Sequence, residues 1–119
     1  SCFLGPETKL DMMYMPDAVS AAIAVMEADQ DVLQHRNAFN VTAMQLTPEV
    51  LSAEIQKHLP GFTIDYDVDP VRQAIADSWP QSIDDTEARS DWGWHHEYDL
   101  DGLVNVMLEN LKLSLVATQ

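Results

Sequence analysis

The stretch that decides the fold class is TPEVLSAEIQKHLPGFTIDYDVDP, residues 47–70. Thr47 can accept hydrogen bonds from free N–H groups of a helix, and Pro48 suits the first helical position because the N–H it lacks would have had no partner there. The apolar residues that follow, Leu51, Ile55 and Leu59, are spaced four apart. This spacing predicts a helix that ends before Pro60 and Gly61.

Three short strands are predicted around this helix. Residues 62–68 alternate between apolar and polar side chains, which is typical of a strand with one solvated face. Residues 10–14 form a short apolar run that closes at Pro16, and residues 38–41 form another short candidate. Because helices separate these strands, we expect a parallel or mixed sheet.

Helices are predicted on both sides of these strands. A first helix begins at the cap Asp17, and its apolar residues share one stripe that must pack on another surface: Val19, Ala22, Ile23 and Met26. A polar loop, residues 27–36, follows it. A short helix over 69–75 starts with a cap and a proline, and residues 77–83 are expected to be loop or a brief extended piece.

Two more helices close the chain. One is capped by Asp84 or Asp85 and runs to about Trp92, with Gly93 placed where a left-handed residue would end it. The last is capped by Asp99, and its apolar residues form a second stripe in need of a partner surface: Leu100, Leu103, Val104, Met107, Leu111 and Leu115.

Together these elements predict a single α/β domain over residues 1–119. It would be a small two-layer or three-layer unit of about three short strands with four to five helices. The chain is long enough to bury roughly two-thirds of the surface that its unfolded form exposes. No internal repeat or linker interrupts it.

Composition excludes several classes of partner. Six basic residues stand against 20 acidic ones, and the net charge of −14 repels nucleic-acid phosphates and anionic lipids. Cys2 is the only cysteine, so neither an intramolecular disulfide nor a multi-thiolate metal site can form. There is no signal-peptide pattern and no apolar run of about 18 residues. We therefore expect a cytoplasmic protein with no membrane or nucleic-acid partner.

The motifs of nucleotide-dependent catalysis are absent from these residues. The four glycines are scattered, so they assemble neither a G-x-G-x-x-G fingerprint nor a phosphate loop. None of the three tyrosines is followed four residues later by lysine, because Tyr14, Tyr66 and Tyr98 precede Ala18, Pro70 and Gly102 at that spacing. We expect no catalytic and no cofactor-binding residues within this chain.

Two clusters imitate metal sites. Asp65, Asp67 and Asp69 open like a calcium loop, but the sixth position is Pro70 and the twelfth is Ala76. These three are better explained by a solvated strand face and a helix cap. The segment from His95 to Asp99 fails the H-E-x-x-H spacing because Leu100 stands where the second histidine belongs, and a surface turn is the favoured interpretation. No metal site is predicted.

Three stretches resemble one known family: MMYMPD at 12–17, NVTAMQLTP at 40–48, and RQAIADSWPQSIDDTEARSDWGW at 72–94. They are similar to the C-terminal region of the L-threonine 3-dehydrogenases of the extended short-chain dehydrogenase group, relatives of nucleotide-sugar epimerases. The similarity extends from about Cys2 to Leu111. The chain also begins without methionine, so we expect that a tag was removed or that a preceding part of a larger protein is absent.

The resemblance implies a partial fold without the Rossmann nucleotide-binding half. In that family the first half carries the NAD site and the catalytic Tyr, Lys and Ser or Thr, while the second half forms a lid-like substrate domain. The reaction moves a hydride from C3 of L-threonine to NAD. The chain is thus expected to be the substrate-side portion of such an oxidoreductase and inactive alone.

The resemblance also suggests which residues line the substrate cleft. Trp79 is the first candidate, since a tryptophan between polar residues can close over a small amino acid and exclude water. Ser78 and Tyr14 are lesser candidates. It remains equally open that Trp79 only docks its loop onto the core, and Trp92 and Trp94 are expected to anchor the last helices.

A second functional class stays open. The chain could be a stand-alone, non-enzymatic binding or assembly module that self-associates through the face left by the missing half. Exposed apolar surfaces of several hundred Å² favour association, so a homodimer would be expected. An independent enzyme with a new site has only the acidic and histidine clusters in its favour.

Overall fold

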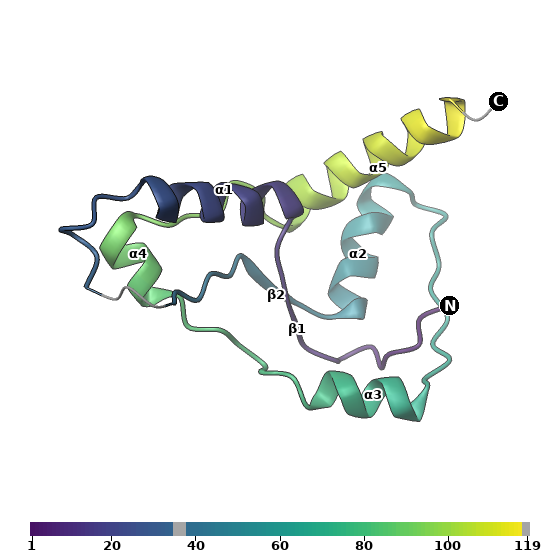
Figure 1. The fold of residues 1–119 in the computed structure, drawn as a ribbon. Coiled ribbons are helices and arrows are strands. Elements are labelled where there is room, and N and C mark those ends of the chain that lie inside the picture. Colours follow the sequence, from purple (N-terminus) through teal and green to yellow (C-terminus); the bar gives the residue numbers. More distant parts are fainter. Residues whose placement is uncertain (35–37, 118–119) are drawn as a thin grey trace.

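A computed structural model describes residues 1–34 and 38–117 of the chain. Two strands and five helices lie within this part, in the order shown in Figure 1. The predicted α/β class is confirmed, and the five helices agree with the predicted four to five. The elements are β1 (Leu10–Met12), α1 (Met15–Glu27), β2 (Met44–Leu46), α2 (Pro48–His58), α3 (Pro70–Asp77), α4 (Thr86–Trp92) and α5 (Leu100–Ala117).

The sheet is smaller than predicted and has a different direction. β1 pairs with β2 in antiparallel fashion, with Leu10 opposite Leu46 and Met12 opposite Met44. The prediction of about three strands in a parallel or mixed sheet was therefore wrong for the described residues. β1 lies within the predicted 10–14 run, whereas 38–41 forms no strand and the pairing starts only at Met44.

Residues 62–68 are extended but do not make the predicted strand. A single parallel bridge joins Tyr66 to Cys2, held by Cys2 N–H to Asp65 O at 2.7 Å and Asp67 N–H to Cys2 O at 2.9 Å. The alternation indicated the correct faces as far as Tyr66, because Phe62, Ile64 and Tyr66 are half-buried and the residues between them are exposed, but Val68, predicted on the buried face, is exposed. One side of an extended segment packs here without a ladder of neighbouring strands.

α1 is built differently from the prediction at its start. Tyr14 occupies the cap position without a side-chain cap bond, and Pro16 lies in the first turn. Asp17, predicted to be the cap, is instead 2 % exposed. Its two carboxylate oxygens accept the backbone N–H groups of Glu97 and Tyr98, each at 3.1 Å. The start of α1 is thereby tied to the segment before α5.

The predicted stripe of α1 is on the wrong face. Val19 is 53 % and Met26 is 75 % exposed, and Ile23 is exposed as well, whereas Ala21 is buried. The helix has apolar residues on both faces, so periodicity alone could not identify the buried one, and the face with the larger side chains was predicted. The predicted loop after it begins at Ala28, and the described chain follows it to Gln34; residues 35 and 36 of that prediction lie outside the described residues.

The remaining helix ends follow the predicted chemistry. Thr47 Oγ1 accepts the N–H of Val50 at 3.3 Å, and Asp69 Oδ1 accepts those of Val71 and Arg72. Gly93 closes α4 with φ +74°, the left-handed conformation expected of it. Before α4, Asp85 holds the cap position without a cap bond, while Asp84 accepts the N–H of Thr86. At the start of α5, Asp99 Oδ1 accepts the N–H of Gly102.

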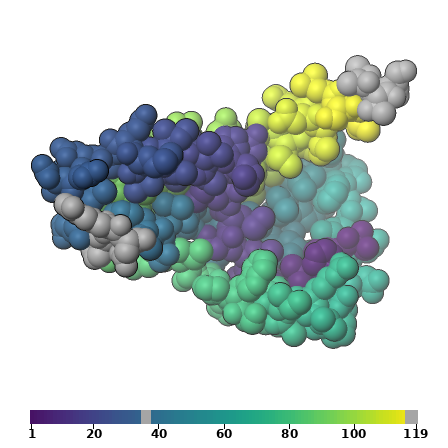
Figure 2. Space-filling model, viewed as in Figure 1, coloured from purple at the N-terminus to yellow at the C-terminus, as the bar shows by residue number. Residues whose placement is uncertain are grey.

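The core is small and lies between α1, α4 and the segment that leads into β2. Ala21, Ala88 and Trp94 form its buried centre, with Phe39 and Trp92 packed against them. The α5 stripe is buried only at its base, since Val104 is buried but Met107, Leu111 and Leu115 are exposed. Beyond its contact with α2, α5 projects from the rest of the molecule (Figures 1 and 2).

The chain is more extended than its length requires. Its radius of gyration is 17.3 Å, against about 13–14 Å for a compact domain of this length. Its accessible surface is 8351 Å² for 13.3 kDa, and a compact monomer of that mass exposes about 6,450 Å². The excess amounts to roughly 1,900 Å². No helix in the described ranges has both the length and the apolar run required to cross a bilayer.

Candidate functional site

Tyr14 lies in the turn that joins β1 to α1. Its ring meets that of Tyr98 edge to face, with centroids 4.7 Å apart. The hydrogen bonds from Glu97 and Tyr98 to the buried Asp17 hold the partner ring in this position. Tyr14 is therefore a half-buried side chain fixed between the start of α1 and the segment preceding α5.

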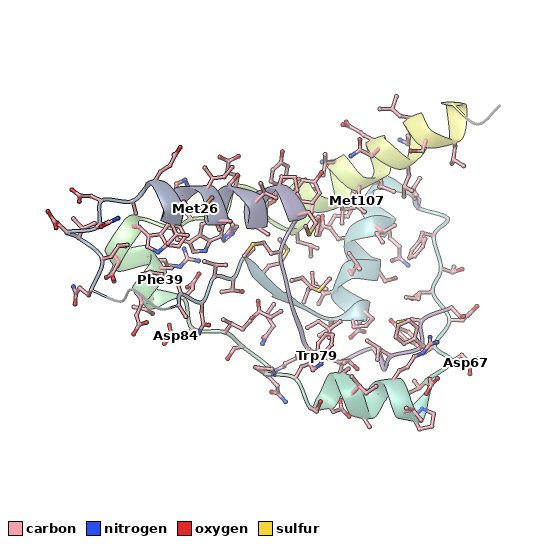
Figure 3. All side chains as sticks on the ribbon, viewed as in Figure 1. Met26, Phe39, Asp67, Trp79, Asp84 and Met107 are labelled. Carbon is pink, nitrogen blue, oxygen red and sulfur yellow. The ribbon has the colours of Figure 1, made fainter. Side chains whose placement is uncertain are left out.

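Ser78 and Trp79 lie together where α3 ends. The Ser78 hydroxyl donates to Ile75 O at 2.6 Å, and Trp79 N–H donates to Ala76 O at 3.1 Å. The Trp79 side chain is 58 % exposed, and Figure 3 labels it beside the end of α3. Such exposure leaves the indole able to cover a ligand. The side chain is not part of the buried core cluster.

The loop after Trp79 is tied to the sheet by one carboxylate. Asp11 in β1 accepts the N–H of Ile83 through Oδ2 at 3.0 Å, and its other oxygen accepts the hydroxyl of Thr42. At the other end, Gln73 in α3 accepts the N–H of Gly5 at 2.8 Å. α3 and the loop that follows it thus have defined positions against the N-terminal segment and β1.

The three predicted cleft residues do not form one cluster by themselves. Ser78 and Trp79 are neighbours, but within the described part of the chain no hydrogen bond or ring contact joins either of them to Tyr14. A ligand touching all three would have to bridge two regions of the surface. Their assignment to substrate remains a prediction.

An open apolar groove, which sequence reasoning missed, runs between α1, α4 and residues 38–41. Its volume is about 630 Å³. The groove exists because alanines on this face of α1 leave space opposite Phe39 and Trp92. The alanine-rich composition of α1 was the available signal. The lining residues are Ala18, Ala21, Ala22, Val25, Gln30, Leu33, Ala38, Phe39, Val41 and Trp92, and none of them carries an acid or a base.

The two tryptophans of the WGW sequence are structural, as predicted. Trp94 is buried and donates its indole N–H to Thr42 O at 3.2 Å. Trp92 stacks edge to face on Phe39, with centroids 5.9 Å apart. They bind the end of α4 to the segment before β2. The prediction that they anchor the last helices is correct for α4.

An ion pair between Arg89 and Asp85 lies at the start of α4. Arg89 Nε lies 2.8 Å from Asp85 Oδ1, one helical turn apart. The hydrogen bond from Arg89 lowers the pKa of Asp85, and the same bond raises the pKa of Arg89. This pair joins the cap position of α4 to the next turn of the same helix.

One set of metal-ligand side chains does converge, and it is not either of the sets that the sequence indicated. Glu54 and His58 of α2 and Asp101 of α5 each bring a ligand atom within 4.8 Å of the others. In the described residues, neither the Asp65 series nor the segment from His95 to Asp99 forms such a group. Spacing could not reveal the full set, because Asp101 lies 43 positions after His58.

Known proteins resemble the chain over nearly its whole length. An uncharacterized epimerase/dehydratase of Staphylococcus haemolyticus is 53 % identical over 110 residues, which are 92 % of this chain and 35 % of that protein. The mitochondrial L-threonine 3-dehydrogenase of Bos taurus is 52 % identical over 107 residues, 90 % of this chain and 28 % of the relative. No family model matches the chain.

Solved structures agree with these relatives. The L-threonine dehydrogenase of Clostridium difficile superposes with a TM-score of 0.91 at 50 % identity, over 95 % of this chain and 35 % of that one. The enzyme of Phytophthora infestans gives 0.90 at 48 % identity, over 95 % and 36 %. The chain spans about a third of the length of the proteins it matches. The resemblance seen in the sequence is thus confirmed: over nearly its whole length the chain is similar to L-threonine 3-dehydrogenases and epimerase/dehydratases, and the match is consistent with a C-terminal portion of that family.

Proposed function

We propose that the chain is the substrate-side portion of an NAD-dependent L-threonine 3-dehydrogenase-like oxidoreductase and acts together with a nucleotide-binding portion. The observation that carries the proposal is the high identity to L-threonine 3-dehydrogenases over only about a third of their length. The chain would form one wall of the site, and it is not expected to turn over threonine alone.

Unburied surface supports a partner of this kind. An excess of roughly 1,900 Å² over a compact monomer is more than the approximately 800 Å² that each partner buries in a standard interface. Val19, Ile23 and Met26 of α1 form one exposed apolar face, which we call the outer face of α1. A helix that is apolar on all sides is normally enclosed in a larger structure.

The division of chemistry follows from the residues present. Oxidation of a secondary alcohol needs a base for the hydroxyl proton and an acceptor for the hydride from the same carbon. These 119 residues hold no dinucleotide fingerprint and no Tyr-x-x-x-Lys pair. Base and NAD site are therefore assigned to the other portion, while Trp79, Ser78 and Tyr14 are proposed to contact the small amino acid and exclude water from it.

Reconstitution tests the proposal. The purified chain would be mixed with the separately produced remainder of the Clostridium difficile enzyme, and NADH formation would be followed with threonine and NAD. Activity is expected from the mixture and from neither part alone. Reduction of NAD by the isolated chain would refute the proposal, as would an inactive mixture in which both parts are folded and bound to each other.

Paired variants test whether the outer face of α1 is the contact. Ile23→Glu places a charge on this face, and Ser20→Glu places the same charge on an exposed position about a quarter turn away from it. The first should abolish association, and the second should leave it unchanged. Both should retain the helical content of the chain, because neither side chain is buried.

Trp79 can be tested in the reconstituted mixture. Replacing this exposed residue by alanine should change stability by less than about 0.5 kcal/mol, as for most surface sites. If the indole covers substrate, Trp79→Ala should lower kcat/KM for threonine at least about tenfold, a loss of roughly 1.4 kcal/mol in transition-state binding. Unchanged kinetics would remove Trp79 from the site and leave the proposed division of labour intact.

The same exposed surface favours a second candidate, a self-associating module without enzymatic activity. Sedimentation of the chain alone distinguishes the two. A dimer that persists when the remainder of the enzyme is added, and that Ile23→Glu dissociates, would favour the assembly module. If the chain, whether monomer or dimer, instead forms a one-to-one complex with that remainder, the proposal of an enzyme portion is favoured. A cytoplasmic location is proposed for either.

A further inference from the structure

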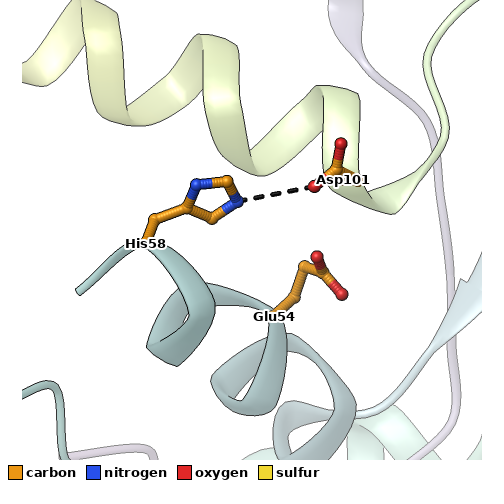
Figure 4. Close-up of side chains that lie close together, drawn as sticks. All are labelled: Glu54, His58 and Asp101. Carbon is orange, nitrogen blue, oxygen red and sulfur yellow. Dashed lines mark ion pairs between the residues drawn. The ribbon is translucent and has the colours of Figure 1, made fainter. Parts of the chain in front are cut away.

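Three side chains with metal-ligand atoms meet where the first turn of α5 lies against the last turns of α2 (Figure 4). Glu54 and His58 are four residues apart, so they share one face of α2. Asp101 faces them from α5, and its Oδ1 lies 3.5 Å from His58 Nε2. One ligand atom from each residue falls within 4.8 Å of the other two.

Two polar atoms of these side chains are buried without a hydrogen-bond partner. Glu54 is only 8 % exposed, and its Oε1 is shielded from solvent with no donor among the described residues. His58 Nε2 is likewise shielded, and at 3.5 Å its approach to Asp101 is too long to count as a hydrogen bond. Folded proteins rarely leave such groups unsatisfied, because burying them unpaired is costly.

We propose that Glu54, His58 and Asp101 bind one divalent transition-metal ion, for which Zn²⁺ is the probe. An imidazole nitrogen and two carboxylate oxygens suit Zn²⁺ at about 2.0–2.2 Å, with water in the fourth position. Ligands around a tetrahedral Zn²⁺ are about 3.4 Å apart, as follows from these bond lengths. The atoms of His58 and Asp101 already have about this separation, and a ligand oxygen of Glu54 lies within 4.8 Å of both.

Charge at the site favours a cation. The two carboxylates would neutralise Zn²⁺, with a neutral imidazole as the remaining ligand. The exposed Lys57 now supplies the positive charge, with its Nζ 2.7 Å from Glu54 Oε2. That hydrogen bond to Glu54, together with the negative charges of Glu54 and Asp101, raises the pKa of Lys57. A metal ion would replace a mobile ammonium by bonds that join α2 to α5.

The consequence is structural and does not depend on the proposed enzymatic role. α5 projects from the body of the molecule, and α2 is the helix against which its base packs. A metal ion at the site defined by Glu54, His58 and Asp101 would fix the direction of α5. Metal binding should therefore stabilise the folded chain, since the three ligands are brought together only on folding.

Titration of the full chain tests the inference. After removal of any histidine tag and treatment with a chelator, Zn²⁺ would be added while heat release and thermal unfolding are measured. We expect one ion per chain, and a midpoint raised by roughly 10 °C at a hundredfold excess over Kd. Asp101→Asn and His58→Ala should each weaken Zn²⁺ binding at least about tenfold. Losing only a residue that hydrogen-bonds to a metal ligand already costs about tenfold or more in affinity.

Matched variants separate this site from nonspecific binding. His95→Ala removes an exposed histidine elsewhere and should leave Zn²⁺ affinity unchanged. Lys57→Ala should increase the affinity, because it removes the competing ammonium. Asp101 is 63 % exposed in its side chain, so Asp101→Asn remains informative even if His58→Ala fails to fold. The inference is overturned if wild-type chain binds no Zn²⁺, if Asp101→Asn binds as well as wild type, or if His95→Ala loses binding equally.

Discussion

Replacement of Asp17 by alanine should produce the largest loss of stability of any single polar substitution considered for this chain. Its carboxylate accepts the N–H groups of Glu97 and Tyr98, each at 3.1 Å, in a site where Asp17 is almost completely buried. A hydrogen bond to a charged acceptor contributes about 1.5–3 kcal/mol. Losing both should therefore cost about 3–6 kcal/mol, and the cost falls toward the lower end where water reaches the freed N–H groups.

Urea unfolding followed by circular dichroism would measure this loss. A chain of this length is expected to have roughly 6–18 kcal/mol of stability, so Asp17→Ala should still fold at room temperature. Asp17→Asn keeps one acceptor and should lose about half as much. The aromatic signal should also change, because the segment that carries Tyr98 would no longer be held against Tyr14.

The control is Asp65→Ala, which removes an exposed carboxylate that makes no side-chain hydrogen bond among the described residues. It should alter stability by no more than about 0.5 kcal/mol. If Asp17→Ala and Asp65→Ala unfold at the same urea concentration, the two backbone bonds to Asp17 contribute nothing, and the account of how α1 is tied to the segment before α5 is wrong.

Two further predictions concern α4. Gly93→Ala should lower the free energy of unfolding in urea by about 1–2 kcal/mol. The cost is conformational, because φ is +74° and a new Cβ would meet no atom within 4 Å. The control Gly61→Ala, also in open space but without a left-handed φ, should cost less than about 0.5 kcal/mol, and equal costs would contradict the explanation. In the folded chain the pKa of Asp85 lies below its usual value, mainly because Arg89 donates a hydrogen bond to it. Its stabilising contribution is thus complete above the unfolded pKa and is lost as pH falls through the lowered folded pKa. Arg89→Met should make acid unfolding less steep below about pH 4, and an unaltered acid profile would show that the pair does not contribute.

Local chemistry made the helix ends predictable. Thr47, Asp69 and Asp99 accept the N–H groups that their positions before helices indicate, and Gly93 has the conformation that a helix end requires. Each of these effects depends on residues within three or four positions, which a sequence displays directly. The prediction that Asp17 caps α1 was wrong because the partners of its carboxylate are not local: they lie 80 and 81 positions away in the sequence.

Strands were less predictable because a strand needs a neighbour. The alternation separated the half-buried from the exposed residues over 62–66 but was wrong at Val68, which is exposed. Only Tyr66 finds a bridge, because the N-terminal segment runs beside it briefly at Cys2. β2 was missed because Met44–Leu46 is three residues long and has no pattern of its own. It becomes a strand only because β1 lies opposite.

The site shows the same limit. Ser78, Trp79 and Tyr14 came from resemblance, and the structure gives each a position without bringing all three together. The cluster of Glu54, His58 and Asp101 could not be found from spacing, because one ligand comes from another helix. The i, i+4 pair Glu54 and His58 was visible in the sequence, but such pairs are common on helix surfaces.

The misplaced stripe of α1 and the excess surface have one cause. Ala21 faces the core, while Val19, Ile23 and Met26 face outward, although the outward residues are the larger and more apolar. In a self-contained domain the larger side chains would be buried, because each gains more from leaving water. We propose that α1 is arranged as a helix between two layers, of which these residues supply one. A second layer on its outer face would make the sequence pattern correct, and for this reason Ile23→Glu is expected to harm assembly without harming the fold.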